Sequence, residues 1–392
     1  MARVNRAAIA VVAAGVAAAM HVGKLPPALP LLREYFGMSL VHASFLVSVF
    51  QLAGLSLGIV GGMLADRFGP RRVMIFGLLL VAGASAAATG SPGSTMLLVT
   101  RAVESAGFIL TVLPGTALLR REVAPERLSV WLGYWAAYMP AGMGLALVVT
   151  PWLLELAGWQ AVWLAVAAVS MALAAMIFRT VTPDGHARSQ APDMRALIVA
   201  TVRTPGPWVL ALAFGCYAAQ WMGVFSFLPT IYQAAGIDLT TAGWLTAAAV
   251  IVNLIGNIAG GWLAHRRWPA HWVIVLGAVA MAAGAWLAFG TEAPFMVRYG
   301  GVVVLSMVGG LVPGTLFTIA PALAPVPSAV STTVGLMQQG SALGQFVSPP
   351  VLAVLASGAS GWSHTWQVTG LFALGDVLAA WMLWRLLRVT HA

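Results

Sequence analysis

Long apolar segments recur along the whole chain and are separated by short polar connections. A helix that crosses a bilayer needs about 20 mostly apolar residues, and twelve stretches reach roughly that length. They are 7–31, 42–65, 73–90, 95–119, 129–153, 160–178, 206–230, 241–264, 272–290, 296–320, 330–355 and 365–387. The pattern therefore predicts an all-α membrane protein with twelve transmembrane helices.

Composition supports the membrane class. Of the 392 residues, 60% are hydrophobic and 8% are charged, whereas soluble domains carry about 25% charged residues. The chain also holds 42 glycines and 22 prolines, which are residues that let membrane helices approach closely and bend. A soluble enzyme or a soluble binding domain is excluded.

The net charge of +9 follows the topology rather than a basic ligand-binding face. Alternate connections hold sixteen of the twenty basic residues: Arg3, Arg6, Arg67, Arg71, Arg72, Arg120, Arg121, Arg127, Arg179, Arg188, Arg195, Arg203, Arg266, Arg267, Arg385 and Arg388. By the positive-inside rule this side is cytoplasmic, and both termini lie on it. We expect a multi-pass protein of a bacterial inner membrane that contacts lipid, binds no nucleic acid and is a monomer.

The sequence lacks the residue patterns that metal binding and ATP-driven pumping require. Cys216 is the single cysteine, and no H-x-x-x-H or C-x-x-C spacing occurs, so we expect no metal site. No G-x-x-x-x-G-K-[ST] loop is present, which argues against ATP-driven pumping by this chain. With no nucleophile–base pair in view, we expect neither an enzyme nor a bound cofactor.

The sequence repeats itself at an offset of 199 residues. The 41-residue stretches that start at Pro30 and Pro229 align without a gap and share thirteen identities, including Gly37 with Gly236. The repeat predicts two pseudo-symmetric six-helix bundles, 1–178 and 206–392, joined by a cytoplasmic linker at 179–205. Parallel repeats of this kind are one layout of carriers that work by alternating access, with the solute site between the repeats near the bilayer midplane.

The tract GGMLADRFGPRR (61–72), between the second and third segments, resembles the signature loop of the major facilitator superfamily. The resemblance implies that Asp66, beside Arg67 and Arg71, bridges the two halves and stabilises one gate state. In the second copy His265 stands where Asp66 would be, so this role is assigned to the first copy alone. Arg71 has an alternative role as an orientation charge.

Lys24 is the only lysine in the chain, and it lies within the first apolar segment in HVGKLPPALP. An ionisable residue inside a membrane span is a functional candidate by default. His21 lies one turn earlier on the same helical face. We interpret His21 and Lys24 as a solute-binding pair in which Lys24 attracts an anion and His21 carries a proton. The alternatives are that Lys24 extends to the lipid headgroups and that His21 only packs.

Arg101 and Glu104 lie three residues apart in the fourth segment, and we expect them to form an ion pair. The order R-x-x-E-x-x-G, ending at Gly107, resembles a superfamily pattern whose arginine is linked to proton coupling. The candidates for proton coupling are therefore His21, Arg101 and Glu104, and a structural ion pair is the alternative. Asp376 in the last segment is expected to be a locally hydrogen-bonded acid, with a functional role as the alternative.

Neutral polar residues complete the predicted solute site: Tyr134, Tyr138, Gln220, Asn253 and Gln338. Gln220 is the repeat equivalent of His21, which favours a common orientation of the two side chains. Amide side chains such as Asn253 also join membrane helices by hydrogen bonds, and that role is the alternative for each amide. Most of the sixteen tryptophans, Trp159 and Trp163 among them, are interpreted as interfacial anchors.

Four further tracts resemble the cyanate and nitroimidazole permease branch of the superfamily: KLPPALPLL, LGYWAAYMPAGMGLALVVTPWL, FSFLPTIYQAAGI and MQQGSALGQFVSPPVL. The branch more usually has arginine where Lys24 stands. This resemblance implies proton-coupled uptake of a small, often anionic solute. Two alternatives stay open: a proton-coupled drug or metabolite efflux antiporter, whose fifth-segment signature is partly matched by Gly133, Pro140, Gly142 and Gly144, and a membrane receptor that does not transport.

Overall fold

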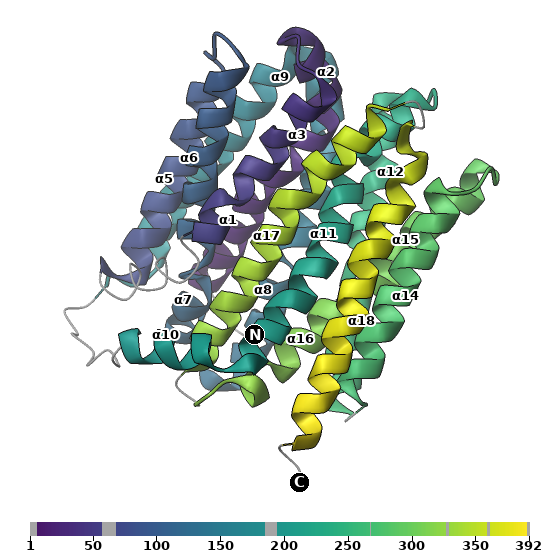
Figure 1. Ribbon diagram of the computed structural model, residues 1–392. Helices are drawn as coiled ribbons and strands as arrows, with labels where there is room; N and C mark the ends of the chain where they lie inside the picture. The colour runs from purple at the N-terminus through teal and green to yellow at the C-terminus, as the bar shows by residue number, and fades with distance from the viewer. Residues whose placement is uncertain are drawn as a thin grey trace. The chain divides into compact units, whose positions relative to one another are not determined.

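The computed structural model describes residues 6–56, 68–184, 194–266, 268–326, 329–358 and 361–389, and its regular elements in these ranges are all helices (Figure 1). The first nine are α1 (Arg6–Gly23), α2 (Leu25–Tyr35), α3 (Leu40–Ser48), the 3-10 turn η1 (Val49–Gln51), α5 (Pro70–Ala88), α6 (Ser94–Val112), α7 (Gly115–Glu122), α8 (Pro125–Ala136) and α9 (Tyr138–Thr180). The predicted all-α class is confirmed.

The remaining helices are α10 (Met194–Arg203), α11 (Pro205–Ala234), α12 (Leu239–Ile251), α13 (Asn253–His265), α14 (Ala270–Phe289), α15 (Phe295–Gly309), α16 (Leu311–Leu323), α17 (Val330–Ala356), η3 (Gly361–His364) and α18 (Thr365–Val389). The chain forms two compact units. One comprises Met1–Ser189 with Leu228–Ala247, and the other comprises Gln190–Phe227 with Ala248–Ala392. Both α11 and α12 therefore begin in one unit and end in the other.

Membrane-crossing lengths match ten of the twelve predicted segments; the segment at 330–355 is not among them, and the segment at 42–65 lies partly outside the described residues. In the described part of the chain, nine helical stretches are long and apolar enough to cross a bilayer. One of them, α9, has 43 residues, about twice the number that a bilayer requires. Gly158 divides it with a φ of 76°, a conformation that glycine adopts without steric cost. The two halves of α9 thus correspond to the separate segments predicted at 129–153 and 160–178.

The internal repeat is visible in local structure. Gly37 and Gly236, which are equivalent at the offset of 199, both have positive φ, at 61° and 85°. Two residues further on, Ser39 accepts a hydrogen bond from the backbone N–H of His42 at 3.1 Å. Its equivalent Asp238 does the same for Thr241 at 2.9 Å. Each side chain caps the helix that follows it, so the two copies build the same turn with the same chemistry.

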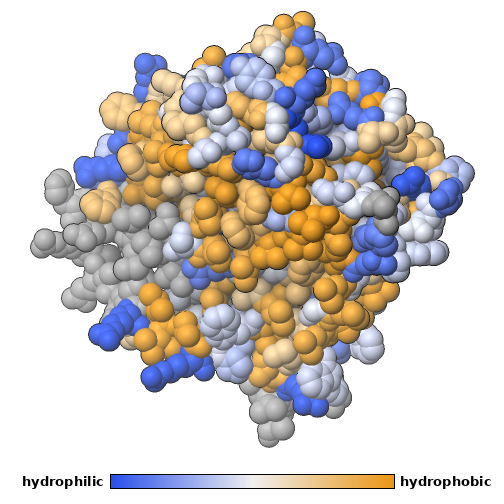
Figure 2. Space-filling view, turned by 45° about the horizontal axis from the view of Figure 1, so that its top comes forward, coloured by the Kyte–Doolittle hydropathy of each residue, from blue (hydrophilic) through white to orange (hydrophobic). Residues whose placement is uncertain are grey.

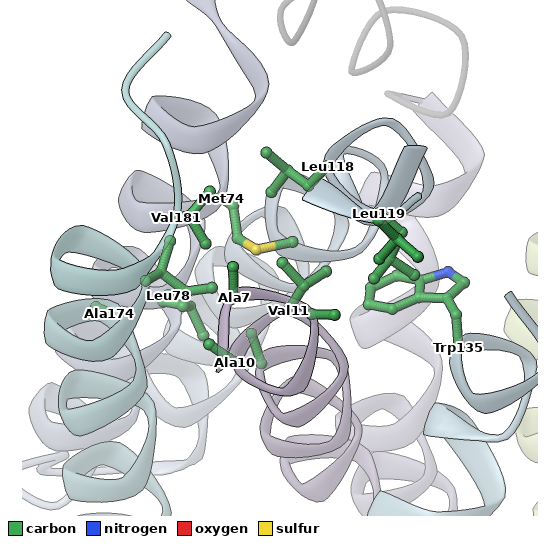
Figure 3. Packing of buried hydrophobic residues seen from close by; sticks show 14 residues of the cluster. Ala7, Ala10, Val11, Met74, Leu78, Leu118, Leu119, Trp135, Ala174 and Val181 are labelled. Carbon is green, nitrogen blue, oxygen red and sulfur yellow. The ribbon is translucent and has the colours of Figure 1, made fainter. Parts of the chain in front are cut away.

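A hydrophobic core of the first unit joins helices from across the sequence (Figure 3). Val11 of α1 contributes to it together with Met74 and Leu78 of α5, Leu119 of α7 and Trp135 of α8. Small side chains on the same face of α1 let the larger ones approach its backbone. Packing of this kind, rather than a hydrophobic driving force, holds helices together inside lipid.

Large apolar side chains also cover the outside of the molecule. Met296 is 72% exposed and Leu371 is 68% exposed, and Figure 2 shows apolar surface over a large part of the visible face. Exposed apolar area on this scale is typical of a surface in contact with another apolar phase. For helices of this length that phase is lipid, so the chain is a multi-pass membrane protein.

Helices α5 and α6 approach each other through glycine. A Cβ atom built on Gly107 of α6 would lie 2.5 Å from the backbone nitrogen of Val81 and 2.8 Å from the carbonyl oxygen of Gly77, both in α5. Backbone atoms cannot move aside as a flexible side chain can. This contact positions α6, and α6 carries Arg101 and Glu104.

We predict that Gly107→Leu separates α5 from α6 and lowers the free energy of unfolding by about 1–3 kcal/mol, the usual cost of overpacking. The measurement is the thermal unfolding midpoint of the purified protein in detergent. The matched control is Gly83→Leu in α5, because Gly83 is exposed and its added Cβ meets nothing within 4 Å. Equal midpoints for the two variants would contradict the prediction.

Candidate functional site

Lys24 lies at the junction of α1 and α2, inside the first unit. Its backbone N–H still donates to the carbonyl of Met20 at 2.9 Å, but Pro26, Pro27 and Pro30 follow and have no N–H to donate. The lysine side chain is fully buried, with 0% exposure. The alternative in which Lys24 reaches the lipid headgroups is therefore wrong for this structure.

Three acceptors surround the Lys24 amine. Its Nζ donates to Glu104 Oε1 at 2.8 Å and to Ser85 Oγ at 2.8 Å, and lies 3.2 Å from His21 Nδ1. It also lies 4.5 Å from the ring centroid of Trp163. An ammonium has three N–H donors and no acceptor, so three acceptors match the charged form. The hydroxyl of Ser85 donates onward to the Trp163 carbonyl at 2.9 Å.

Glu104 lies between two cations. Its second carboxylate oxygen, Oε2, accepts from Arg101 Nη1, so the ion pair predicted from the three-residue spacing is confirmed. Arg101 also donates to the His21 carbonyl at 2.9 Å and to the Leu46 carbonyl at 3.2 Å, and its guanidinium lies 4.3 Å from the ring centroid of Phe50. The arginine therefore joins three separate helical segments.

The hydrogen bonds of His21 define its tautomer. Because the Lys24 ammonium can only donate, His21 Nδ1 must accept. The ring proton is then on Nε2, which lies 3.0 Å from Ser170 Oγ in α9 and donates to it. His21 is neutral in this arrangement, and the lone pair on its Nδ1 accepts the hydrogen bond from Lys24 Nζ.

The cluster formed by His21, Lys24, Arg101 and Glu104 has unequal charges. Two cations face one carboxylate, while the histidine is neutral. All four side chains are at most 1% exposed. Taking an ion out of water is costly unless an opposite charge compensates it. The cluster therefore holds one positive charge in excess, and this excess is the chemical property that an anion would satisfy.

The tyrosines predicted for the solute site lie apart from this cluster. Tyr134 in α8 is 57% exposed, and its ring centroid lies 5.5 Å from that of Trp131. Tyr138 begins α9 and lies against Trp135, with ring centroids 4.9 Å apart, and it is partly buried against the hydrophobic core that contains Trp135. Their predicted contact with solute stays a prediction.

In the second unit Asn253 connects three helices. Its Nδ2 donates to the Tyr217 hydroxyl of α11 at 3.0 Å and to the Ser306 carbonyl of α15 at 2.7 Å. Its own Oδ1 accepts from Asn257 at 2.8 Å. These bonds fit the alternative role of joining helices. Gln338 of α17 is exposed, so the second-unit candidates do not form one cluster.

Gln220 is buried in α11 and pairs with an acid rather than with the Asn253 group. Its Nε2 donates to Asp376 Oδ2 of α18 at 2.8 Å. Both side chains are 0% exposed. The expectation that Asp376 is a locally hydrogen-bonded acid is confirmed.

A second ionic group in the first unit connects the start of α5 with the segment that follows α9. Asp184 accepts from the backbone N–H groups of Arg71 and Arg72 at 3.2 Å and 3.0 Å, and from Arg121 Nη1 at 2.8 Å. Burial by itself raises the pKa of the Asp184 carboxyl, but the bonds from Arg121, Arg72 and Arg71 hold that pKa below its usual range. Gly69 has a φ of 93°, and a Cβ there would lie 2.3 Å from the Asp184 carboxylate.

The gating residues are only partly described. Asp66 and Arg67 lie outside the described residues. The Arg71 guanidinium donates to the carbonyl of Phe178 and lies 4.9 Å from the Phe178 ring centroid. Arg71 thus connects α5 to the end of α9 within one unit, and its roles as a gating residue and as an orientation charge stay predictions.

Sequence reasoning missed the neutral partners of the Lys24 cluster. Ser85 and Ser170 carry no signal in a single sequence, because serine is common in membrane helices. The interpretation of Trp163 and Trp159 as interfacial anchors was wrong: they are 0% and 2% exposed. Trp163 forms part of the lining around Lys24, because its electron-rich ring face favours an ammonium.

Comparison with known proteins places the chain in a family. The model of the Major Facilitator Superfamily matches residues 7–326 and 210–391. The chain belongs to the Major Facilitator Superfamily. The twelve-helix, two-domain architecture expected from the sequence repeat is that of this superfamily.

Several curated members of the superfamily are similar to this chain. A "probable sulfoacetate transporter" of Cupriavidus necator is 26% identical over 61% of this chain and 60% of the relative. The cyanate transport protein of Escherichia coli is 26% identical over 59% and 60%. A "probable nitrate/nitrite transporter" of Mycobacterium tuberculosis is 27% identical over 82% of each chain. The matches thus span about 60% of the length of the first two relatives.

A solved superfamily structure confirms the fold. A bacterial homologue of the human lysosomal transporter Spinster, crystallised in an inward-facing and unoccupied conformation, superposes with a TM-score of 0.80 at 17% identity. The match covers 97% of this chain and 96% of that structure. At this identity the likeness extends to the fold alone.

We predict that Glu104→Gln destabilises the protein by about 3–5 kcal/mol, the usual cost of breaking a buried ion pair from one side. The change raises the excess charge of the cluster from one to two. Lys24→Met instead removes the excess and leaves Arg101 paired with Glu104, so it should unfold close to the wild-type temperature. Thermal unfolding in detergent measures both.

The double variant Lys24→Met/Glu104→Gln is the control for charge balance. It restores a single excess charge on Arg101 and should be more stable than Glu104→Gln alone. If adding Lys24→Met makes Glu104→Gln less stable, the charge argument is wrong and packing around the lysine stem dominates.

For Asp184 we predict a pH-dependent contribution. Its lowered pKa means that the ionised carboxyl stabilises the folded state above the unfolded-state pKa of about 3.9, and that this stabilisation is lost as pH falls through the folded-state value. Asp184→Asn should cost about 1–2 kcal/mol at neutral pH. The gap to wild type should narrow only as pH falls below the unfolded-state pKa and through the lowered folded-state pKa of Asp184, and Glu292→Gln, at an exposed acid, should show no such gap. A gap that is independent of pH would contradict the assignment.

Proposed function

We propose that this protein is a secondary active transporter that imports a small anionic solute together with protons by alternating access. The observation that carries the proposal is the unbalanced positive charge of the buried cluster at Lys24. A neutral or cationic solute cannot compensate the excess positive charge of the cluster, whereas an anion would compensate it.

The cluster also supports the coupling of anion to proton. Lys24 shares its ammonium between Glu104 and His21. An anion that draws this ammonium toward itself leaves the Glu104 carboxylate and the His21 Nδ1 lone pair without their donor. Each of them can then accept a proton. Anion binding and proton binding would thus favour each other, as symport requires.

Similar proteins support the same solute class. The names of three relatives specify sulfoacetate, cyanate and nitrate or nitrite, which are all small anions. Gln220, Asn253, Gln338, Tyr134 and Tyr138 remain proposed contributors to the solute path, and Asp66, Arg67 and Arg71 remain proposed gating residues. The arginine distribution supports a bacterial inner-membrane location with both termini in the cytoplasm, and we propose that the transporter acts as a monomer.

The test is uptake of radiolabelled sulfoacetate, cyanate and nitrate into proteoliposomes under an inward proton gradient. We predict that the wild type accumulates at least one of these anions and that Lys24→Met reduces its uptake at least tenfold. The reason is that the variant removes the charge that attracts the anion without unbalancing the remaining ion pair. Thermal unfolding of the same preparations verifies that the variant is folded.

Arg203→Met is the matched control, because it removes one positive charge from an exposed position on α10 and should transport normally. Lys24→Arg keeps the charge but not the compact ammonium with its three donors, and we expect it to bind anion and turn over slowly. Normal uptake by Lys24→Met would overturn the proposed role of this residue.

Export of organic compounds is the second candidate. A methylenomycin A resistance protein of Bacillus subtilis is 32% identical over 34% of this chain. Export predicts resistance to several lipophilic compounds on overexpression, with little dependence on Lys24. Resistance that persists in Lys24→Met would favour this alternative over anion import.

A further inference from the structure

The second unit contains a buried carboxyl group for which the described residues provide no balancing cation. Asp376 lies in α18 with 0% exposure and contacts Gln220 of α11. In the first unit the equivalent of Gln220 is His21, which lies in the Lys24 cluster. The two units thus use the same position of the repeat for different polar groups.

No charged partner for Asp376 is found on the described elements packed around it. From α11 it faces the Cys216 thiol and the Tyr217 hydroxyl, and Tyr217 is bound to Asn253. Helix α17 carries no ionisable side chain along its length. His271 of α14 lies against Trp384, two turns further along α18.

The other ionisable groups on these elements are distant along the helix. Arg385 stacks on Trp381 with 3.8 Å between its guanidinium and the ring centroid, and His364 of η3 bonds Gln367. At 1.5 Å of rise per residue these groups are about 14 Å and about 18 Å from Asp376 along the axis of α18. An ionised Asp376 would therefore be an unpaired charge in the core of the unit.

Two acceptor atoms of the Gln220–Asp376 pair have no hydrogen-bond donor among the described residues. Gln220 Nε2 donates to Asp376 Oδ2 at 2.8 Å. Asp376 Oδ1 and Gln220 Oε1 are both buried, and neither has a hydrogen-bond donor among the described residues. Both atoms are acceptors as long as the carboxyl is ionised. A proton placed on Oδ1 turns that atom into a donor, and Gln220 Oε1 is a buried acceptor without a donor on the same amide that already binds this carboxyl.

We propose that Asp376 and Gln220 form a proton-binding site in the second unit. Asp376 holds the proton on Oδ1 and donates it to Gln220 Oε1, while Gln220 Nε2 donates to Oδ2. The pair is then a neutral acid–amide pair with two hydrogen bonds. Loss of the proton leaves both oxygens as acceptors without a donor and the carboxylate without a compensating charge, a state that requires water to enter or α11 to move.

Helix α11 gives this proton site a connection to the transport cycle. The helix is continuous from Pro205 to Ala234, but it belongs to the second unit up to Phe227 and to the first unit from Leu228. The helix that holds Gln220 therefore has residues in both units. We infer that the proton is exchanged during each cycle, and this part of the inference rests on the proposed function.

Infrared difference spectroscopy tests the proton directly and needs no solute. We expect the C=O stretching band of a protonated carboxylic acid in the wild type at neutral pH, in a detergent without ester or carboxyl groups. Asp376→Asn should abolish the band and still fold, because its amide donates to Oε1 and accepts from Nε2 as the protonated acid does. Asp184→Asn is the matched control and should keep the band.

Gln220→Met provides an independent measurement. It removes the donor to the acid carbonyl, so the band should shift to higher frequency rather than disappear. A wild type without the band, or a band that survives in Asp376→Asn, overturns the proton site. A band that does not move in Gln220→Met overturns the pairing.

A transport experiment measures the number of protons that move with each anion, from the reversal potential of uptake in proteoliposomes. The anion is sulfoacetate, or cyanate or nitrate if sulfoacetate is not taken up. Asp376→Asn should lower this ratio by one and keep counterflow of the anion. An unchanged ratio overturns the exchange step. If the wild type transports none of the three anions, the proposed function fails, while the infrared result still decides the proton site.

Discussion

The ion pairs of one carboxylate, that of Glu104, are the interaction on which the buried cluster of the first unit depends. It accepts from Lys24 with one oxygen and from Arg101 with the other, and Arg101 extends the network to the carbonyls of His21 and Leu46. The residues on either side of the acid come from different parts of the chain, so the ion cluster and the helix packing depend on each other. Small residues such as Gly107, which set the distance between α5 and α6, are therefore part of the electrostatic arrangement.

The fold could be predicted from the sequence because its causes are periodic and local. Apolar length defines the spans, and the offset of 199 residues defines the repeat, while the orientation expected from arginine placement stays a prediction. The caps at Ser39 and Asp238 show that the repeat extends to single hydrogen bonds. The spacing of Arg101 and Glu104 predicted their pairing, since side chains three residues apart are neighbours on any α-helix.

The site could be predicted only in part, because its remaining contacts connect residues that are distant in the chain. No local rule brings Ser85, Ser170 and Trp163 next to Lys24 and His21. Asp184 was assigned to the linker by composition, yet it closes the start of α5 across more than one hundred residues. The neutral partners carry no signal of their own, and a tryptophan near the end of a predicted span resembles an interfacial anchor whether it faces lipid or lies beneath an ammonium.

The single lysine has a practical consequence. Because every other basic side chain in the chain is arginine or histidine, reagents that acylate side-chain amines have one target, and that target is enclosed on all sides in this structure. Acylation of Lys24 therefore requires that solvent and reagent reach the buried cluster of the first unit. Its rate, followed by mass spectrometry, turns an internal charge into a natural reporter of conformational opening, with no engineered cysteine or attached dye.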